Sequence, residues 1–413
     1  SLKILSKNNF NKNEKIIYVK GSGKDMSDID IDGFPALELN NLLKLRKKTK
    51  LNDFQMVNFQ KKFMLDTTFP NASVETLLHA FLPHKFIDHS HSNAILSLID
   101  QPNDKQICKK VFGNKLGIVP YIMPGFNLSK KAIEIYEKNP KVEGLILLNH
   151  GIFTFGDTAK QSYQRMIKFI SIAEKALKNK SKKIKKDNYI EKKIEPSYIA
   201  NLLRKYLSIP KEDDFEKKII SFTKLSFTNN LFSKKIINKI NAPVTPDHVI
   251  RIKSKPLFLD FSNIKNKSIE NFINKEITKY KNKYIKYFKN YKHINKNAIM
   301  HDPSPRLILV KGMGLFSSGK NYKETKIAKD VGLNSLSVIF NSFKYGTFKA
   351  ISPRDIFKME YWPLELAKLK PSSSSLQGNI TLITGGLGTL GYATAKKFLN
   401  EGSEVIILDN KNK

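Results

Sequence analysis

The sequence predicts a mixed α/β fold that is followed by the start of a second, parallel α/β unit. In residues 1–180, short apolar strands such as 16–20 and 144–148 alternate with helical patterns such as 163–177. Residues 379–413 follow the order strand, glycine turn, helix and strand. The chain of 413 residues exceeds the usual size of one domain, so we expect two or three domains.

The composition is that of a folded chain with a basic surface. A hydrophobic fraction of 40% and an aromatic fraction of 10% supply enough apolar side chains for a core. Lys and Arg number 72 against 37 Asp and Glu, which gives a net charge of +35. This excess is spread along the chain and no recognised nucleic-acid-binding motif accompanies it, so we expect no nucleic-acid partner. A basic surface still attracts small phosphorylated molecules.

Cysteine usage and hydropathy favour the cytoplasm. The single cysteine, Cys108, excludes an intramolecular disulfide and a thiolate zinc site, and it suits a reducing compartment. No apolar run reaches the length of about 18 residues that a membrane helix needs, so we expect no membrane partner. The chain begins with Ser1, and the two strands and one helix at its end cannot bury their own faces. We therefore expect a fragment truncated at both ends.

Changes in composition divide the chain into parts. A Lys-rich connector covers residues 178–197, and the region after it is mainly helical, with a long basic helix over 269–292 and a short strand over 256–261. We expect, in chain order, a first domain over 1–180, a middle region over 198–370, a Ser-rich linker over 371–378 and the beginning of a further domain over 379–413.

The middle region contains a stretch that is similar in sequence to part of the first domain. The stretch 307–326 resembles 145–164 in its order of strand, glycine-bearing turn and helix start. The residues that then stand opposite one another are Asp247-His248 and Asp88-His89, Ile250 and His91, and Lys311-Gly312 and His150. The middle region is either a degenerate second copy that has lost its chemistry or a chance similarity, and the sequence leaves both readings open.

Three histidines form a candidate metal site. His89 and His91 lie two residues apart on an expected strand over 86–91, so both side chains leave the same face and can hold one ion. His150 follows a separate buried strand, at a turn where Gly151 permits close approach of the backbone. Three histidines leave a fourth coordination position open, as in catalytic zinc sites.

Other histidines have a more ordinary explanation. A lone histidine in a strand or helix is more often a hydrogen-bonded core or surface residue than a metal ligand. We expect this ordinary role for His79, on a helix over 75–82, and for His84, which follows Pro83.

The stretches 73–91 and 145–156 resemble the class II aldolase and adducin-head family. This resemblance implies that His89, His91 and His150 bind zinc or another divalent metal and that Glu75 is the catalytic acid/base. It also implies phosphate binding by four further residues, namely Gly21, Ser22, Gly23 and Ser73. Backbone N–H groups in a glycine turn suit such an anion. Ala72 stands where many members have a second serine, and the family's upstream Asn-x-Ser contact is not visible.

The resemblance also implies the chemistry. A metal ion would stabilise the negative charge that develops when a carbon–carbon bond breaks, and Glu75 would move the proton. The expected partner is a small sugar phosphate, and the family's tendency to form tetramers implies a homo-oligomer.

The C-terminal stretch carries a nucleotide-binding fingerprint. A glycine-rich turn over 384–391 lies between an expected strand and an expected helix, and an acidic residue ends the next strand. Such glycines let the backbone approach a pyrophosphate, and the acid hydrogen-bonds a ribose hydroxyl, which favours NAD over NADP. The stretch resembles the short-chain dehydrogenases, whose catalytic Tyr-x-x-x-Lys would lie beyond residue 413. The cofactor-binding residues expected from it are Gly385, Gly388, Leu390, Gly391 and Asp409.

The order of parts resembles a bifunctional group that joins a rhamnulose-1-phosphate aldolase to a lactaldehyde dehydrogenase. The stretches 243–251, 309–320 and 360–369 look like the middle part of this group. The resemblance implies release of dihydroxyacetone phosphate and lactaldehyde, with the dehydrogenase acting on the aldehyde or a related polyol. Two alternatives remain open: a pentose-phosphate 4-epimerase that uses the same metal site, and a non-catalytic adducin-like module, which is expected to lack the histidine set.

Overall fold

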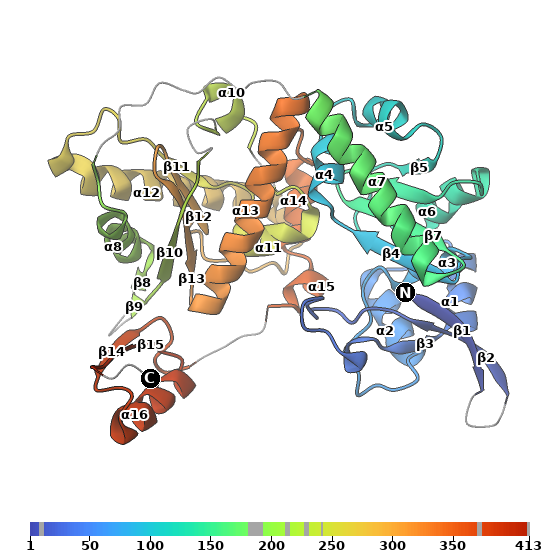
Figure 1. The fold of residues 1–413 in the computed structure, drawn as a ribbon, viewed down its shortest axis with the longest axis horizontal. Coiled ribbons are helices and arrows are strands. Elements are labelled where there is room, and N and C mark those ends of the chain that lie inside the picture. Colours follow the sequence, from blue (N-terminus) through green and yellow to red (C-terminus); the bar gives the residue numbers. More distant parts are fainter. Residues whose placement is uncertain are drawn as a thin grey trace.

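The computed structural model describes two lobes and a small C-terminal βαβ unit (Figure 1). We call residues 1–180 the N-terminal lobe, residues 193–369 the middle lobe and residues 374–410 the C-terminal unit. The described residues are 1–7, 12–180, 193–210, 215–226, 231–240, 243–369 and 374–410. Most of the expected Lys-rich connector and the first part of the expected linker lie outside these residues. Within the described residues, no helix combines the length and the apolar character that a bilayer span requires.

The N-terminal lobe is built on a seven-stranded mixed sheet of order β3-β2-β1-β4-β7-β6-β5. Its strands are β1 (Leu2–Lys7), β2 (Asn13–Tyr18), β3 (Ala36–Glu38), β4 (Phe86–Ser90), β5 (Leu116–Val119), β6 (Gly144–Leu147) and β7 (Gly151–Gly156). All residues of β6 and β7 are buried, because helices cover both faces of the sheet at this point.

The helices of this lobe follow the apolar patterns of the sequence. The α-helices are α1 (Leu39–Lys44), α2 (Asp53–Lys62), α3 (Thr76–Phe81), α4 (Asn93–Ile99), α5 (Asp104–Phe112), α6 (Phe126–Lys138) and α7 (Ala159–Asn179). Two short 3₁₀ helices, η1 (Ile31–Gly33) and η2 (Leu45–Lys47), accompany them. The predicted helix over 163–177 is confirmed as part of α7, which Thr158 caps by accepting a hydrogen bond from the Gln161 N–H.

The middle lobe contains a sheet, of which the sequence predicted only the strand over 256–261 and the strand that begins the stretch 307–326. Four strands have the order β10-β13-β12-β11, and a separate pair joins β8 to β9. Their bounds are β8 (Ile209–Pro210), β9 (Phe215–Glu216), β10 (Ile219–Lys224), β11 (Leu257–Leu259), β12 (Leu307–Val310) and β13 (Gly314–Gly319). The expectation of a mainly helical region was therefore incomplete, although the long helix over 269–292 is present as α12 (Ile269–Tyr291).

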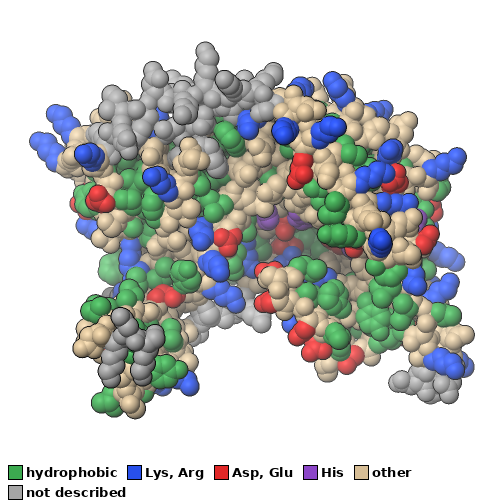
Figure 2. Space-filling model, viewed as in Figure 1, with side chains coloured by type: hydrophobic (Ala, Val, Ile, Leu, Met, Phe, Trp, Pro, Cys, Tyr) green, Lys and Arg blue, Asp and Glu red, His purple; other side chains and the backbone are tan. Residues whose placement is uncertain are grey.

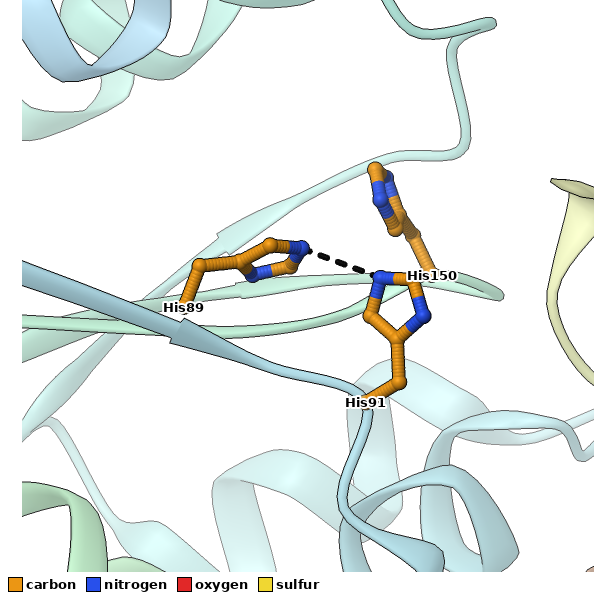
Figure 3. Close-up of side chains that lie close together, drawn as sticks. All are labelled: His89, His91 and His150. Carbon is orange, nitrogen blue, oxygen red and sulfur yellow. Dashed lines mark hydrogen bonds between the residues drawn. The ribbon is translucent and has the colours of Figure 1, made fainter. Parts of the chain in front are cut away.

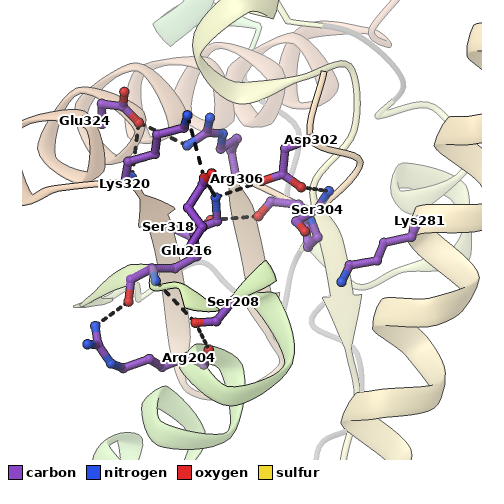
Figure 4. Close-up of polar contacts among 12 residues, drawn as sticks. Arg204, Ser208, Glu216, Lys281, Asp302, Ser304, Arg306, Ser318, Lys320 and Glu324 are labelled. Atoms are coloured by element: carbon purple, nitrogen blue, oxygen red, sulfur yellow. Dashed lines mark hydrogen bonds and ion pairs between the residues drawn. The ribbon is translucent and has the colours of Figure 1, made fainter. Parts of the chain in front are cut away.

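The middle lobe contains further helices. They are α8 (Pro196–Leu207), α10 (Lys234–Ile237), η3 (Pro246–His248), α11 (Val249–Ile252), η4 (Asn266–Ser268), η5 (Lys292–Ile294), α13 (Tyr322–Tyr345), α14 (Pro353–Glu360) and α15 (Pro363–Leu366). At one edge of the lobe, Lys218 is 1% exposed and pairs with Glu216 and Asp302, at Nζ to oxygen distances of 2.8 and 3.0 Å. Figure 4 shows these two acids within a larger network of polar contacts.

The two sheets share a substructure. The order β4-β7-β6-β5 has the same strand directions as β10-β13-β12-β11, namely antiparallel, antiparallel and parallel. The pair Leu147 and Gly151 closes the first hairpin, and Val310 and Gly314 close the second, each around a turn of the same length. A side-chain-capped helix follows each hairpin, α7 in one lobe and α13 in the other.

This register corrects the residue pairing expected from the sequence. Phe222 faces Phe316 as His89 faces Phe153, so Phe222 rather than His248 occupies the place of His89. Counting along the two turns puts Met313 at the place of His150. By the same register Lys224 rather than Ile250 follows at the place of His91. The sequence pairing failed because the similarity of letters set Leu307 against Leu145, whereas the hairpin ends place Ile308 there, an offset of one residue. It also failed because β10 was not recognised.

A common apolar core joins the lobes. Helices α4 and α7 of the N-terminal lobe pack against α13 of the middle lobe at the junction seen in Figure 1. Buried side chains from both sides, such as Ile99, Phe169 and Ile339, belong to one cluster. The Ser342 hydroxyl donates to the Ser97 carbonyl at 3.1 Å within this contact. The orientation of the lobes is thus held by close packing.

The C-terminal unit consists of β14 (Ile380–Thr384), α16 (Thr389–Asn400) and β15 (Glu404–Leu408). The two strands are parallel, with Ile380 opposite Glu404 and Thr384 opposite Leu408. This order confirms the sequence expectation of strand, turn, helix and strand for these residues. Figure 1 shows the unit set apart from the N-terminal lobe.

Candidate active site

Three histidine side chains meet at the end of β4 that faces the junction of the lobes. His89 lies within β4, His91 follows directly after its last residue, and His150 lies in the turn between β6 and β7. One nitrogen atom of each ring lies within 4.8 Å of the others. The Nε2 atoms of His89 and His91 are 3.0 Å apart, as the dashed line in Figure 3 marks. The three predicted ligands therefore converge on one point.

The turn that carries His150 is shaped by its two neighbours. Asn149 adopts a φ of 55°, in the left-handed region that asparagine tolerates, and its side chain donates to Asp100 Oδ1 at 3.1 Å. A Cβ atom at Gly151 would lie 2.6 Å from the Ser90 carbonyl oxygen and 2.9 Å from Cδ2 of His91. Glycine is thus required for the turn and the end of β4 to approach so closely.

The protonation pattern of His89 suits a metal ligand. Its Nδ1–H donates to the carbonyl oxygen of Ile152 at 3.0 Å, which leaves the lone pair of Nε2 directed at the other two rings. The ring also stacks on Phe153, with centroids 4.1 Å apart. Burial lowers the pKa of both His89 and His91, which favours the neutral imidazole that binds a metal. The residues present therefore fit a divalent ion.

Glu75 lies at the start of α3 and faces this group. Its Oε1 is 3.1 Å from Nε2 of His150, and its Oε2 is 3.4 Å from Nε2 of His89. Burial acts to raise the pKa of the carboxyl, but the nearby His89 and His150 rings, together with a hydrogen bond from His150, outweigh burial and hold this pKa well below its usual range. Burial lowers the pKa of His150, but the negative charge of Glu75, together with its hydrogen bond and weaker nearby charges, outweighs burial. The pKa of His150 is therefore raised. With the Glu75 side chain 15% exposed, the carboxylate is recessed yet within reach of a small molecule.

The glycine turn lies beside Glu75, and some of its backbone N–H groups are hydrogen-bonded within the protein. The Ser73 N–H donates to the Lys20 carbonyl oxygen at 3.2 Å, and the Ser73 hydroxyl accepts from the Glu75 N–H at 3.3 Å. The N–H groups of Gly21 and Ser22 already donate to carbonyl oxygen atoms of the protein, at 2.7 and 2.8 Å. The four expected residues are thus brought together, whereas two of the backbone donors assigned to phosphate are occupied.

The middle lobe brings acidic residues to the same place, which the sequence reading missed. Asp247, at η3, and Glu365, in α15, are close enough that their charges act on His150 to raise its pKa, against the lowering by burial. Both lie in stretches that the sequence singled out, 243–251 and 360–369, without a role for individual residues. The His79 ring lies tilted against Phe153 and the His84 ring stacks on Phe155, and both stay outside the histidine group, as expected.

The residues expected to bind a dinucleotide gather around one turn of the C-terminal unit. Gly385 has a φ of 65°, and a Cβ atom at Gly391 would lie 2.2 Å from the Gly385 carbonyl oxygen, so both positions require glycine. Asp409 Oδ2 accepts from the Leu387 N–H at 2.9 Å, which places the carboxylate at this turn. The side chain of Leu390, at the start of α16, is 84% exposed.

Comparison with known proteins gives two family matches. Residues 7–177 match the family model described as Class II Aldolase and Adducin N-terminal domain. Residues 194–369 match the model described as Aldolase class II, second domain. A curated relative, the Uncharacterized oxidoreductase YuxG of Bacillus subtilis (strain 168), is 30% identical over 426 residues, which cover 99% of this chain. The chain spans 60% of the length of that relative.

Two solved structures are similar to part of the chain. The N-terminal class II aldolase domain of a conserved protein from Thermoplasma acidophilum is 38% identical, with a TM-score of 0.40, over 42% of this chain and 81% of that one. YgbL of Klebsiella pneumoniae, described as a putative aldolase/epimerase/decarboxylase, is 16% identical with a TM-score of 0.27, over 42% of this chain and 75% of that one.

Proposed function

Because residues 7–177 and 194–369 form class II aldolase domains, we propose that the chain cleaves a ketose 1-phosphate by a metal-dependent retro-aldol reaction. The proposed substrate resembles rhamnulose 1-phosphate, and the products are dihydroxyacetone phosphate and lactaldehyde. The observation that carries the proposal is the convergence of His89, His91 and His150 beside the Glu75 carboxylate. These histidines would hold Zn²⁺ or another divalent ion.

The described side chains account for the proton transfers of such a reaction. The hydroxyl group at C4 of the sugar loses its proton, the C3–C4 bond breaks, and its electron pair moves toward the carbonyl oxygen at C2. C3 then gains a proton, which completes dihydroxyacetone phosphate. Glu75 is proposed to carry the proton, because its carboxylate is ionised and lies among the imidazole nitrogen atoms. A bound divalent ion supplies the positive charge that stabilises the developing negative charge.

The test measures products as well as rate. Metal-loaded protein is incubated with rhamnulose 1-phosphate, and lactaldehyde, dihydroxyacetone phosphate and epimeric sugars are quantified. We expect free lactaldehyde and its loss in His89→Ala, whereas His293→Ala, which removes an exposed histidine, serves as the matched control. An epimerised sugar phosphate without free aldehyde would favour the pentose-phosphate 4-epimerase instead. If neither product forms, the non-catalytic adducin-like module becomes the favoured alternative.

For the C-terminal unit we propose NAD binding and a short-chain dehydrogenase role, acting on the aldehyde or a related polyol. The glycine turn with Asp409 beside it supports this proposal, and the B. subtilis relative is named an oxidoreductase. Titration of the chain with NADH, followed by fluorescence, provides the test. Binding that is weakened in Asp409→Asn supports the assignment, and identical binding in both proteins contradicts it.

We also propose that the middle lobe is a degenerate second copy of the N-terminal lobe. The shared strand order, the equal turns and the capped helices support a duplication. Phe222 and Met313 at the places of His89 and His150 would leave one metal site in the pair of lobes.

We further propose that the chain forms a homo-oligomer. Size-exclusion chromatography with light scattering tests this proposal directly.

A further inference from the structure

A small apolar cluster joins the middle lobe to the N-terminal lobe beside Glu75. Trp362 and Leu364 of the middle lobe pack with Val74 and Tyr121 of the N-terminal lobe. The indole Nε1–H of Trp362 also donates to Asp53 Oδ2, at 2.6 Å. Because Val74 directly precedes Glu75 in the chain, this cluster fixes α15 next to the candidate active site.

Two charged residues, Glu365 and Lys368, follow Trp362 and Leu364 in the chain. Glu365, directly after Leu364, is 2% exposed, and its Oε1 accepts from the Lys368 ammonium group at 2.5 Å. Its Oε2 is buried and has no hydrogen-bond partner among the described residues. The Lys368 side chain, in contrast, is 25% exposed. Glu365 thus holds Lys368 in place while the ammonium group keeps access to solvent.

Lys368 approaches the glycine turn from the other lobe. Leu364, four residues before Lys368, packs with Val74. The N–H of the neighbouring Ser73 donates to the Lys20 carbonyl oxygen at 3.2 Å, so the segment that carries Lys368 meets the segment that carries Lys20. Burial lowers the pKa of Lys20, and the positive charge of Lys368 lowers it further. Lys20 directly precedes Gly21, and its ammonium group donates to the Gly21 carbonyl oxygen at 3.3 Å. Asp25, which is exposed, offsets part of the Lys20 charge. Two cations brought together from different lobes repel one another, and an anion between them relieves this repulsion.

The glycine turn itself supplies no charged donor for a phosphate group. The backbone N–H groups of Gly21 and Ser22 donate to protein carbonyl oxygen atoms and are not available to a ligand. The side chains that remain near the turn are the hydroxyls of Ser22 and Ser73, which are neutral. A phosphate dianion is bound much better when charged donors meet it. Figure 2 shows histidine and acidic side chains at the base of a hollow between the lobes, with Lys and Arg side chains near its rim.

We infer that Lys368 of the middle lobe binds the phosphate group of the substrate together with Lys20, so that the substrate is held between the two lobes. Glu365 acts as a positioning residue for Lys368. The inference rests on the proposed function for the identity of the substrate, but not for the binding of phosphate itself. It assigns to the second aldolase domain a direct part in substrate recognition.

A matched pair of lysines separates this role from a purely structural one. Lys368 and Glu365 form an ion pair three residues apart, at 2.5 Å. Lys358 and Asp355 form a pair of the same spacing in the same lobe, at 2.9 Å. We therefore compare Lys368→Gln with Lys358→Gln, and we add Lys368→Arg, which keeps the charge.

The experiment is isothermal titration of the full, metal-loaded chain with three probes: inorganic phosphate, dihydroxyacetone phosphate and dihydroxyacetone. In Lys368→Gln we expect Kd for both phosphate-bearing probes to rise about 10-fold or more, since a hydrogen bond to a charged group is lost. Kd for dihydroxyacetone and the bound metal should stay unchanged. Lys368→Arg should recover most of the affinity, and Lys358→Gln should match the wild type.

Three results overturn the inference. The first is equal phosphate affinity in Lys368→Gln and Lys358→Gln, and the second is a rise of Kd for dihydroxyacetone in Lys368→Gln as large as the rise for the phosphate-bearing probes. The third is no phosphate binding by the wild type. The test is also independent of the aldolase reaction. If rhamnulose 1-phosphate is not cleaved while phosphate binding still depends on Lys368, the proposed function fails and the inference stands. If cleavage occurs and Lys368→Gln leaves KM unchanged, the proposed function stands and the inference fails.

Discussion

The carboxylate oxygen Oε1 of Glu75 lies 3.1 Å from Nε2 of His150, although Glu75 precedes helix α3, His150 lies in the β6–β7 turn, and the two are far apart in the chain. The contact joins a proton-carrying group to a candidate metal ligand. It depends on the start of α3 and on the β6–β7 turn meeting at the same point. This relationship separates the roles of the two side chains and makes them individually testable.

Replacing Glu75 by Gln should abolish most activity without removing the metal. The amide keeps the size of the carboxylate but cannot accept a proton, so we expect kcat to fall by about 10² to 10⁴-fold. Metal content should remain that of the wild type, because the three histidine nitrogen atoms are unchanged. The measurement is steady-state kinetics combined with elemental analysis. A Glu75→Gln protein with wild-type kcat would remove Glu75 from the mechanism.

Adding one methyl group at Gly151 should disturb the metal site. The new Cβ would lie 2.6 Å from the Ser90 carbonyl oxygen and 2.9 Å from the His91 ring, so one of the two must move. We expect weaker metal binding in Gly151→Ala and a loss of stability of about 1 to 3 kcal/mol. Gly113→Ala is the control, because Gly113 has a φ of 62° that strains an alanine, but a Cβ atom there meets nothing within 4 Å and Gly113 belongs to no site. Equal metal affinity in both variants would contradict the account.

The buried Lys218 should be essential for stability. Lys218 is 1% exposed and its ammonium group compensates Glu216 and Asp302, so Lys218→Met leaves two carboxylates without their cation. Breaking such a buried pair costs about 3 to 5 kcal/mol. Urea unfolding measures this loss. Lys279→Met, which removes an exposed lysine paired with Glu276, should change stability by no more than about 0.5 kcal/mol. Similar effects of both substitutions would show that the network contributes little.

The free energy of unfolding should increase with pH because of Lys3, a buried lysine in β1. Burial lowers the pKa of Lys3 to about 7, whereas the unfolded chain keeps the ordinary value of 10.5. Below pH 7 the amine is charged in both states, and the cost of burying this charge is fully present. Between pH 7 and 10.5 the unfolded state binds more protons, so the free energy of unfolding rises, by at most about 1.4 kcal/mol per pH unit. Lys3→Met should lack this rise relative to the wild type; parallel pH profiles of the two proteins would refute the assignment.

The core of the candidate site could be predicted from local sequence. His89 and His91 sit two residues apart at a strand end, and His150 sits at a glycine-bearing turn after a buried strand, so their spacing carries the information. The strand β10 was missed because it is short and only partly buried, with Ile219 as its only buried residue. Its partner β13 was not predicted as a strand either, because its residues were read only as part of the stretch 307–326 that resembles 145–164. Strands of this kind are defined by their neighbours more than by their own composition.

The contribution of the middle lobe could not be predicted from sequence. Glu365 and Lys368 lie in a stretch that reads as a short helix, and no local pattern indicates a ligand. Their position follows from the packing of Trp362 and Leu364 on the N-terminal lobe, which is a contact between distant parts of the chain. The same holds for the glycine turn, whose donors are occupied by carbonyl groups that only the tertiary structure brings near.

The central claim is that His89, His91 and His150 together hold one divalent metal ion. The most direct test is elemental analysis of the purified chain, with the same measurement on His89→Ala and on His293→Ala as the control. The account predicts about one ion per chain in the wild type and in His293→Ala, and loss of the ion in His89→Ala. A full complement of metal in His89→Ala would contradict it.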